Sequence, residues 1–172
     1  MELLILRHAA AFPRDATRWP DDAARPLTAE GVKKARRAAA GLKRITPRPM
    51  RVLTSPLVRA RDTATIFAQA ARWPKAVECA ALSPGASPEE VLEALRREGG
   101  KLECVAVVGH QPHLGRLLAL CIRGHARAEG FELKKSAVAC VRFEGSPRAG
   151  QGALAWLLAP RMLRQLWRPK NK

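Results

Sequence analysis

Side chains that could bind an anion follow three short apolar runs of the sequence. The runs are Glu2–Leu6, Met50–Thr54 and Cys104–Val108. The side chains that follow them are Arg7, His8, Arg59 and His110. Apolar runs of this length are typical of buried strands, and the carboxyl ends of parallel strands form the edge where open α/β sheets bind ligands. If the three strands are parallel, we expect the four side chains to converge at that edge.

Such a cluster of cations repels itself unless an anion neutralises it. A phosphoryl group suits the cluster, because the planar guanidinium of an arginine matches two phosphate oxygens. A neutral histidine adds a nucleophilic nitrogen, whose attack on phosphorus gives a covalent phosphoenzyme. Arg59 also falls in the first turn of an expected helix, where free backbone N–H groups favour an anion. One Arg-His pair is weak evidence, but three matching strand endings predict a phosphate site.

Amphipathic stretches alternate with the apolar runs and predict an α/β protein built in layers. A first helix is expected to begin at Thr28 and to run to about Arg44. A second is expected to begin at Ser55, with Pro56 in the first helical position, and to run to about Ala71. A third is expected to begin at Ser87, which Pro88 and Glu90 follow. The remaining expected elements are helices over Pro112–Ile122 and Pro160–Trp167, and strands over Val138–Phe143 and Ala153–Leu158. We expect one three-layer α/β/α domain with a mostly parallel central sheet over residues 1–158. A short helix and a basic tail would follow over residues 159–172.

The composition is that of a globular protein, with 47% apolar and 27% charged residues in a chain of 172. No apolar run approaches the roughly 18–20 residues of a membrane span. Met1–Leu6 has no basic region or cleavage site of a signal peptide, so we expect the cytoplasm. The cysteines show no zinc-ligand spacing and are expected to be buried free thiols; they are Cys79, Cys104, Cys121 and Cys140. We therefore expect no metal and no other cofactor.

The chain carries a formal net charge of +16, which must attract anions over long range. Nucleic acid, an acidic protein and a phosphoprotein all fit this charge, and part of it is an ordinary solvated surface. A module that binds nucleic acid or polyphosphate is one alternative function. Aromatic residues are few, with four Phe, four Trp and no Tyr, and they do not alternate with basic residues as in proteins that stack bases. Nucleic acid is thus the less favoured partner.

Four segments, in order along the chain, resemble motifs of the histidine phosphatase superfamily, the phosphoglycerate mutase-like proteins. Leu6–Ala9 resembles R-H-G/A, and Arg25–Gly31 resembles R-P-L-T-x-x-G. Ser55–Ala64 resembles S-P-x-x-R-A-x-Q-T-A, and Val108–Pro112 resembles V-G-H-x-P. The resemblance covers roughly residues 1–158 and is closest to the phosphohistidine phosphatases of the SixA type. It implies a phosphoglycerate mutase-like fold and a metal-independent phosphatase.

The resemblance also implies a role for each matching residue. His8 would be the nucleophile, Arg7 and Arg59 would bind the phosphate, and His110 would be a further ligand of the transferring group. Arg25 is either a fourth cation at the rim of the pocket or a structural partner at the edge of the sheet. Asp62 stands where the family commonly has Gln, which puts one supporting contact in doubt.

The stretch Ala80–Ser87 departs from the relatives that cleave phosphate esters, which carry a proton-donating Glu near this point. It contains no carboxylate. An alkoxide leaving group needs a proton, so a missing acid should slow ester cleavage by about 10²–10⁴-fold. The imidazole of a phosphohistidine is a far less demanding leaving group. Asp15 is a possible substitute donor.

Other residues of possible interest are His113, expected on the outer side of a helix start, His125, expected in a loop, and Lys134 and Lys135, which could help an anionic partner dock. The leading hypothesis is a monomeric phosphatase for phosphohistidine on a protein, which also binds phosphate-like anions. A phosphatase for a small ester, such as a sugar phosphate or nucleotide, is the alternative within the same chemistry.

Overall fold

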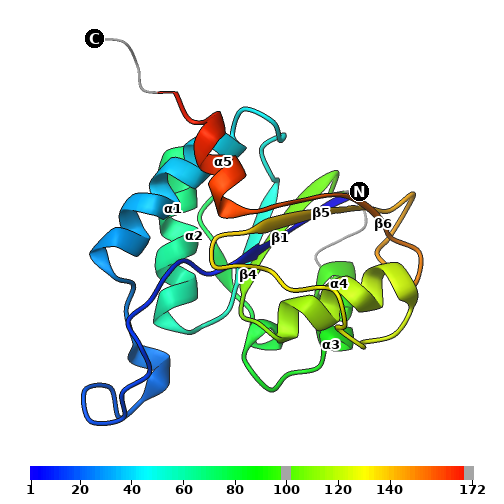
Figure 1. Ribbon diagram of the computed structural model, residues 1–172. Helices are drawn as coiled ribbons and strands as arrows, with labels where there is room; N and C mark the ends of the chain where they lie inside the picture. The colour runs from blue at the N-terminus through cyan, green and yellow to red at the C-terminus, as the bar shows by residue number, and fades with distance from the viewer. Residues whose placement is uncertain (98–101, 169–172) are drawn as a thin grey trace.

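The computed structural model describes residues 1–97 and 102–168 and shows a six-stranded sheet between two layers of helices (Figure 1). The strands are β1 (Glu2–Arg7), β2 (Arg51–Thr54), β3 (Val77–Glu78), β4 (Cys104–Gly109), β5 (Val138–Arg142) and β6 (Ala153–Leu158). The α-helices are α1 (Ala29–Leu42), α2 (Val58–Ala71), α3 (Pro88–Arg97), α4 (His113–Arg123) and α5 (Pro160–Leu166). The 3-10 helices are η1 (Asp22–Ala24) and η2 (Ala80–Leu82).

The strand order is β3-β2-β4-β1-β5-β6. Strands β1 to β4 pair in parallel, whereas β5 is antiparallel to β1 and β6 is antiparallel to β5. The predicted three-layer fold with a mostly parallel sheet is confirmed. Both Leu6 and Thr54 lie in register with Val108. Strands β1, β2 and β4 therefore end at one level, on one edge of the sheet.

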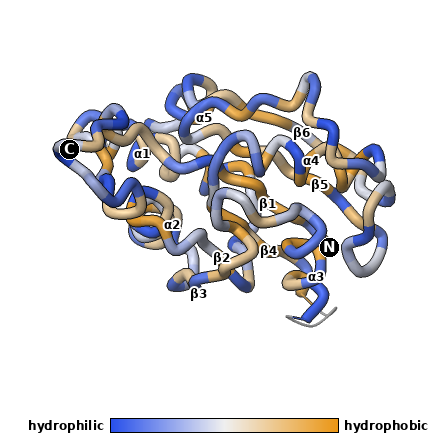
Figure 2. The backbone as a smooth tube through the Cα atoms, turned by 90° about the horizontal axis from the view of Figure 1, so that it is seen from below, coloured by the Kyte–Doolittle hydropathy of each residue, from blue (hydrophilic) through white to orange (hydrophobic). Residues whose placement is uncertain are grey.

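Apolar side chains on both faces of the sheet hold the central strands in place. Helices α1, α2 and α5 cover one face, with Leu42, Phe67 and Leu163 in the buried cluster beneath them. Helices α3 and α4 cover the other face, over a second cluster that includes Leu95 and Leu118. Figure 2 shows hydrophobic residues along the central strands and hydrophilic ones on the outer turns. Each large aliphatic side chain buried this way contributes about 1.5–3 kcal/mol.

Helix α1 begins as predicted and also fixes the loop that follows His8. The Thr28 hydroxyl caps the helix by accepting from the backbone N–H of Gly31 at 3.0 Å. The backbone N–H of Thr28 donates to the carbonyl of Ala10 at 3.0 Å. A Cβ on Gly31 would lie 2.1 Å from that same carbonyl oxygen, so glycine is needed where the loop meets the helix.

The predicted helix cap at Ser55 is wrong. Helix α2 begins only at Val58, with Leu57 in the N-cap position and no side-chain capping bond. Ser55 is completely buried, and its hydroxyl lies against the imidazole of His110. Ser and Pro before a helix are typical of an N-cap, but here they form the turn between β2 and α2 beneath the sheet edge.

The capping box predicted for α3 is confirmed. The backbone N–H of Ser87 donates to the Glu90 carboxylate at 3.0 Å, and the N–H of Glu90 donates to the Ser87 hydroxyl at 3.3 Å. Strand β3 and the two 3-10 helices were not predicted, because two or three residues are too few for a hydrophobic period to show. Within the residues that the structure describes, no helix has the length and apolarity to cross a membrane. Part of the expected basic tail, residues 169–172, lies outside the described residues.

Helix α5 packs closely on α1. Leu163 is fully buried, and a Cβ on Gly41 would lie 1.8 Å from its carbonyl oxygen. The glycine therefore sets how closely the two helix backbones approach.

Candidate active site

The predicted convergence of His8 and His110 occurs at the edge of the sheet where β1, β2 and β4 end. Their ring centroids are 5.0 Å apart. Arg7 lies opposite Gly109 in the β1–β4 ladder, and the backbone N–H of His8 donates to the carbonyl of Gly109 at 3.0 Å. Arg59 lies in the first turn of α2. Both arginines lie close enough to His8 to lower the pKa of its imidazole, so all four predicted site residues surround one point.

The His8 ring is oriented by a contact with the next residue. Its Nδ1 lies 2.7 Å from the carbonyl oxygen of Ala9. A carbonyl only accepts, so Nδ1 carries the proton and Nε2 keeps a free lone pair. Burial, together with the nearby charges of Arg59 and Arg7, lowers the pKa of His8 to about 4. The ring is therefore neutral at neutral pH, with Nε2 available as a nucleophile.

Arg7 is held by the segment before β5. One terminal nitrogen donates to the carbonyl of Leu133 at 2.6 Å. Ser136, buried with φ at +64°, turns its backbone N–H toward the carbonyls of Arg7 and His8, at 3.1 and 3.2 Å. The segment of residues 131–136 thus forms one wall of the site.

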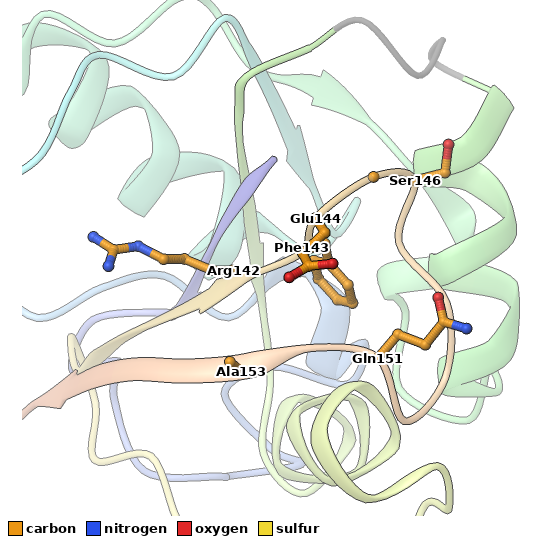
Figure 3. A pocket seen from close by; sticks show the side chains of 7 residues that line it. Arg142, Phe143, Glu144, Ser146, Gln151 and Ala153 are labelled. Carbon is orange, nitrogen blue, oxygen red and sulfur yellow. The ribbon is translucent and has the colours of Figure 1, made fainter.

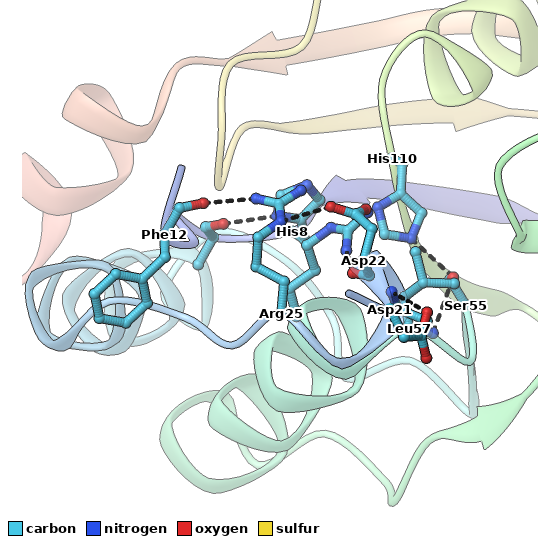
Figure 4. Close-up of polar contacts among 11 residues, drawn as sticks. His8, Phe12, Asp21, Asp22, Arg25, Ser55, Leu57 and His110 are labelled. Atoms are coloured by element: carbon cyan, nitrogen blue, oxygen red, sulfur yellow. Dashed lines mark hydrogen bonds and ion pairs between the residues drawn. The ribbon is translucent and has the colours of Figure 1, made fainter. Parts of the chain in front are cut away.

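Arg59 is tied into the site through both its backbone and its guanidinium. Its carbonyl accepts from the Thr63 hydroxyl at 2.7 Å, and the same hydroxyl accepts from the backbone N–H of Ala9 at 2.9 Å. Its guanidinium donates to the carbonyl of Asp22 at 2.8 Å and forms an ion pair with the Asp22 carboxylate at 3.1 Å (Figure 4). The side chain is 6% exposed. Burial lowers its pKa, but a guanidinium stays charged at any working pH.

His110 is oriented by Ser55, which the sequence analysis assigned to a helix cap. Its Nε2 lies 2.8 Å from the Ser55 hydroxyl (Figure 4). Burial, followed by the neighbouring His8 and Arg59, lowers the pKa of His110 to about 3, so this ring is neutral as well. If the hydroxyl donates to Nε2, the proton of the ring lies on Nδ1. Ser55 was predicted to cap a helix, whereas its hydroxyl contacts His110.

Buried side-chain nitrogens without a protein partner belong to three of these residues. In the described part of the chain, Arg7 Nε, Arg59 Nε and His110 Nδ1 are buried and make no hydrogen bond. Each unsatisfied buried polar group costs about 1–3 kcal/mol. An anion with several acceptor oxygens would satisfy such donors together.

Arg25 and Asp22 form a second layer beside Arg59. Arg25 Nε donates to the Asp22 carboxylate at 2.8 Å, and Arg25 Nη1 donates to the carbonyl of Phe12 at 2.6 Å (Figure 4). These contacts hold Arg25 against the loop beside Arg59, and its role as a further cation at the rim of the pocket stays a prediction. Asp22 was not predicted, although it stands three residues before Arg25, in a loop rich in charge.

Asp15, the proposed substitute acid, is occupied elsewhere. It is exposed, and its carboxylate accepts from the backbone N–H groups of Thr17 and Arg18 at 3.0 and 3.1 Å.

The outward position expected for His113 is wrong, because its side chain is buried at the start of α4. Asp62 lies half-buried on α2, where burial raises the pKa of its carboxyl.

A separate hollow of about 740 Å³ lies beside the β5–β6 connection, lined by Arg142, Phe143, Glu144 and neighbouring residues (Figure 3). The backbone carbonyl of Phe143 accepts a hydrogen bond from the amino group of Met1. The hollow therefore lies at the amino end of β1, away from the histidines. Within residues 1–97 and 102–168, no group of three or more His, Cys, Asp or Glu is placed to hold a metal ion.

Comparison with known proteins places this arrangement in a family. Residues 3–82 match the family model of the histidine phosphatase superfamily (branch 1). The chain is 31% identical to the phosphohistidine phosphatase SixA of Escherichia coli (strain K12), over 93% of this chain and 94% of that protein. It is 34% identical to an uncharacterized protein of Picosynechococcus, over 83% of this chain and 85% of that protein.

A solved structure has the same fold. The protein histidine phosphatase SixA complexed with tungstate superposes with a TM-score of 0.79 at 30% identity, covering 95% of this chain and 99% of that one. The putative SixA of Agrobacterium tumefaciens shares the fold with a TM-score of 0.74 at 24% identity, over 92% of this chain and 97% of that one. With a neutral histidine, two arginines and a second histidine at the edge of this sheet, the chain belongs to the histidine phosphatase superfamily and is a phosphatase of the SixA type.

Proposed function

We propose that the chain removes the phosphoryl group from phosphohistidine on a protein. In the first step, Nε2 of His8 attacks phosphorus in line with the bond to the substrate imidazole. That P–N bond breaks, its electron pair stays on the substrate nitrogen, and a new P–N bond forms to His8. Arg7, Arg59 and His110 donate to the phosphoryl oxygens and stabilise the charge of the transition state.

The contact between His8 Nδ1 and the carbonyl of Ala9 supports the second step. After transfer, the His8 ring carries phosphorus on Nε2 and a proton on Nδ1, so it is cationic. Water attacks phosphorus, and His8 leaves as a neutral imidazole that keeps its Nδ1 proton. Neither step needs a general acid, because each leaving group is an imidazole protonated on its other nitrogen.

One observation carries the choice of substrate: Asp22, the carboxylate paired with Arg59, is held in its ionised form. Asp22 is hydrogen-bonded to Arg25 and paired with Arg59, and these contacts lower the pKa of its carboxyl below the usual value. It is therefore ionised at neutral pH. An alkoxide leaving group would depart without a proton, whereas an imidazole would not need one.

Three substrates test the proposal: a phosphohistidine-bearing protein, p-nitrophenyl phosphate and an alkyl phosphate, each assayed with EDTA present. We expect kcat/KM for the phosphoprotein to exceed that for the alkyl ester by at least about a hundredfold, the low end of a general acid's effect. The aryl ester, with its good leaving group, should fall between them. Equal rates for phosphohistidine and the alkyl ester would contradict the proposal and favour a small-ester phosphatase. Loss of activity in EDTA, restored by a divalent metal, would contradict the metal-free mechanism.

A further inference from the structure

Asp22 places a carboxylate against Arg59, one of the two arginines of the phosphate site. Its carbonyl and carboxylate both contact the guanidinium of Arg59, at 2.8 and 3.1 Å. Its carboxylate also accepts from Arg25, at 2.8 Å. The side chain of Asp22 is 34% exposed, whereas that of Arg59 is 6% exposed. The carboxylate therefore lies on the solvent side of a phosphate-binding arginine.

The solvent side is where the leaving group must be. His8 is 6% exposed, so the nucleophile is buried. A nucleophile attacks in line, so the leaving group points away from His8 and toward the opening through which a protein substrate enters. Asp22 is the residue of the Arg25–Asp22–Arg59 chain that presents acceptor atoms there.

Asp22 has acceptor capacity left. An ionised carboxylate offers about four lone-pair positions on its two oxygens. One is taken on Oδ1 by Arg25 and one on Oδ2 by Arg59. The remaining positions can accept an N–H from a ligand on the solvent side of Arg59.

Resting on the proposed function, we infer that Asp22 is a specificity-determining residue, which accepts a hydrogen bond from the protonated ring nitrogen of the substrate's phosphohistidine. That ring is bonded to phosphorus through one nitrogen and carries a proton on the other. While the P–N bond breaks, its electron pair returns to the first nitrogen and the proton stays on the second. A carboxylate beside the second nitrogen keeps the ring in this form, and an ester, with no such N–H, gains nothing from it.

The test compares Asp22→Asn with Asp21→Asn, a neighbouring variant that loses the same charge. Within the residues that the structure describes, the Asp21 carboxylate accepts only from the backbone N–H of Ala23, a capping role that Asn also fills. We expect Asp22→Asn to lower kcat/KM for a phosphohistidine peptide about tenfold or more, the effect of losing a charge-assisted hydrogen bond. For p-nitrophenyl phosphate we expect only the loss that follows from weaker support of Arg59, so the ratio of kcat/KM between the phosphohistidine peptide and the aryl ester should fall about tenfold. Asp21→Asn should leave both substrates within about twofold.

Equal losses on both substrates would overturn the inference, because Asp22 would then act only by holding Arg59 in place. No loss on either would overturn it too. The affinity for tungstate shows whether the pocket of the variant is intact, and Asp22→Glu, which keeps the charge, should recover part of the preference for phosphohistidine. A wild-type enzyme that does not act on phosphohistidine at all would instead refute the proposed function.

Discussion

At the scale of single residues, the site depends on two histidines that are kept neutral and turned in fixed directions. His8 is oriented by a backbone carbonyl and His110 by a serine hydroxyl. A buried ring without such a partner could adopt either tautomer, and only one tautomer of His8 leaves Nε2 free to attack. The neighbours of the histidines are therefore as much part of the chemistry as the rings.

Replacing Ser55 tests this orientation. We expect Ser55→Ala to lower kcat for p-nitrophenyl phosphate about tenfold, because His110 loses the hydroxyl that fixes its ring, a net loss of about 1 kcal/mol or more. Tungstate affinity should fall as well. Thr28→Ala is the control: it should cost about 1 kcal/mol in the free energy of unfolding through the lost helix cap while kcat changes little. A Ser55→Ala enzyme with unchanged kcat would show that the hydroxyl does not orient His110.

The lowered pKa of His8 predicts the pH profile. A histidine whose pKa is lowered to about 4 stays neutral, and nucleophilic, at every pH well above 4. After correction for ionisation of the substrate, kcat/KM for p-nitrophenyl phosphate should be flat from about pH 8 down to about pH 5. It should fall as pH drops through about 4, because protonation then blocks Nε2. An inflection near the ordinary histidine value of about 6.5 would contradict the burial argument.

At the scale of elements, three parallel strand endings position the site, and sequence pattern alone predicted them. Buried strands read as continuous apolar runs, and each site residue follows such a run or the turn after it. The residues whose roles were not predicted make contacts between distant parts of the chain. Asp22 meets Arg59 across 37 positions, and Ser55 meets His110 across 55. No local period or cap signal reports such a contact, so Asp22 was missed and Ser55 was taken for a cap.

The approach of α5 to α1 predicts a stability effect without a catalytic one. Gly41→Ala places a Cβ against the carbonyl of Leu163, so the two helices must separate. We expect a loss of about 1–3 kcal/mol in the free energy of unfolding, as for other overpacked sites, measured by urea denaturation. At temperatures where the variant is folded, kcat should remain within about twofold. A large fall in kcat in folded protein would mean that α5 influences the site.

At the scale of the whole molecule, the net charge of +16 should speed encounters with an acidic phosphoprotein. Lys134 and Lys135 are exposed on the wall of the site, and Lys135 is close enough to lower the pKa of His8. Lys33 and Arg36 are exposed on α1 instead.

We expect kcat/KM for the phosphoprotein to fall as salt is raised from 0.05 to about 0.5 M, because the Debye length shrinks. The paired variant Lys134→Gln/Lys135→Gln should lower it more than Lys33→Gln/Arg36→Gln, although each removes two positive charges. Equal effects of the two paired variants would mean that the net charge of the protein, and not the position of Lys134 and Lys135, determines kcat/KM for the phosphoprotein.

The most direct test of the account is the identity of the covalent intermediate. The enzyme is mixed with a ³²P-labelled phosphohistidine protein, quenched in alkali within milliseconds, and digested for mass spectrometry. We expect label on His8, attached at Nε2 because Nδ1 is hydrogen-bonded to the carbonyl of Ala9, and no label in His8→Ala. Label on Nδ1 of His8, label on another residue, or turnover by His8→Ala above a few per cent of wild type would contradict it.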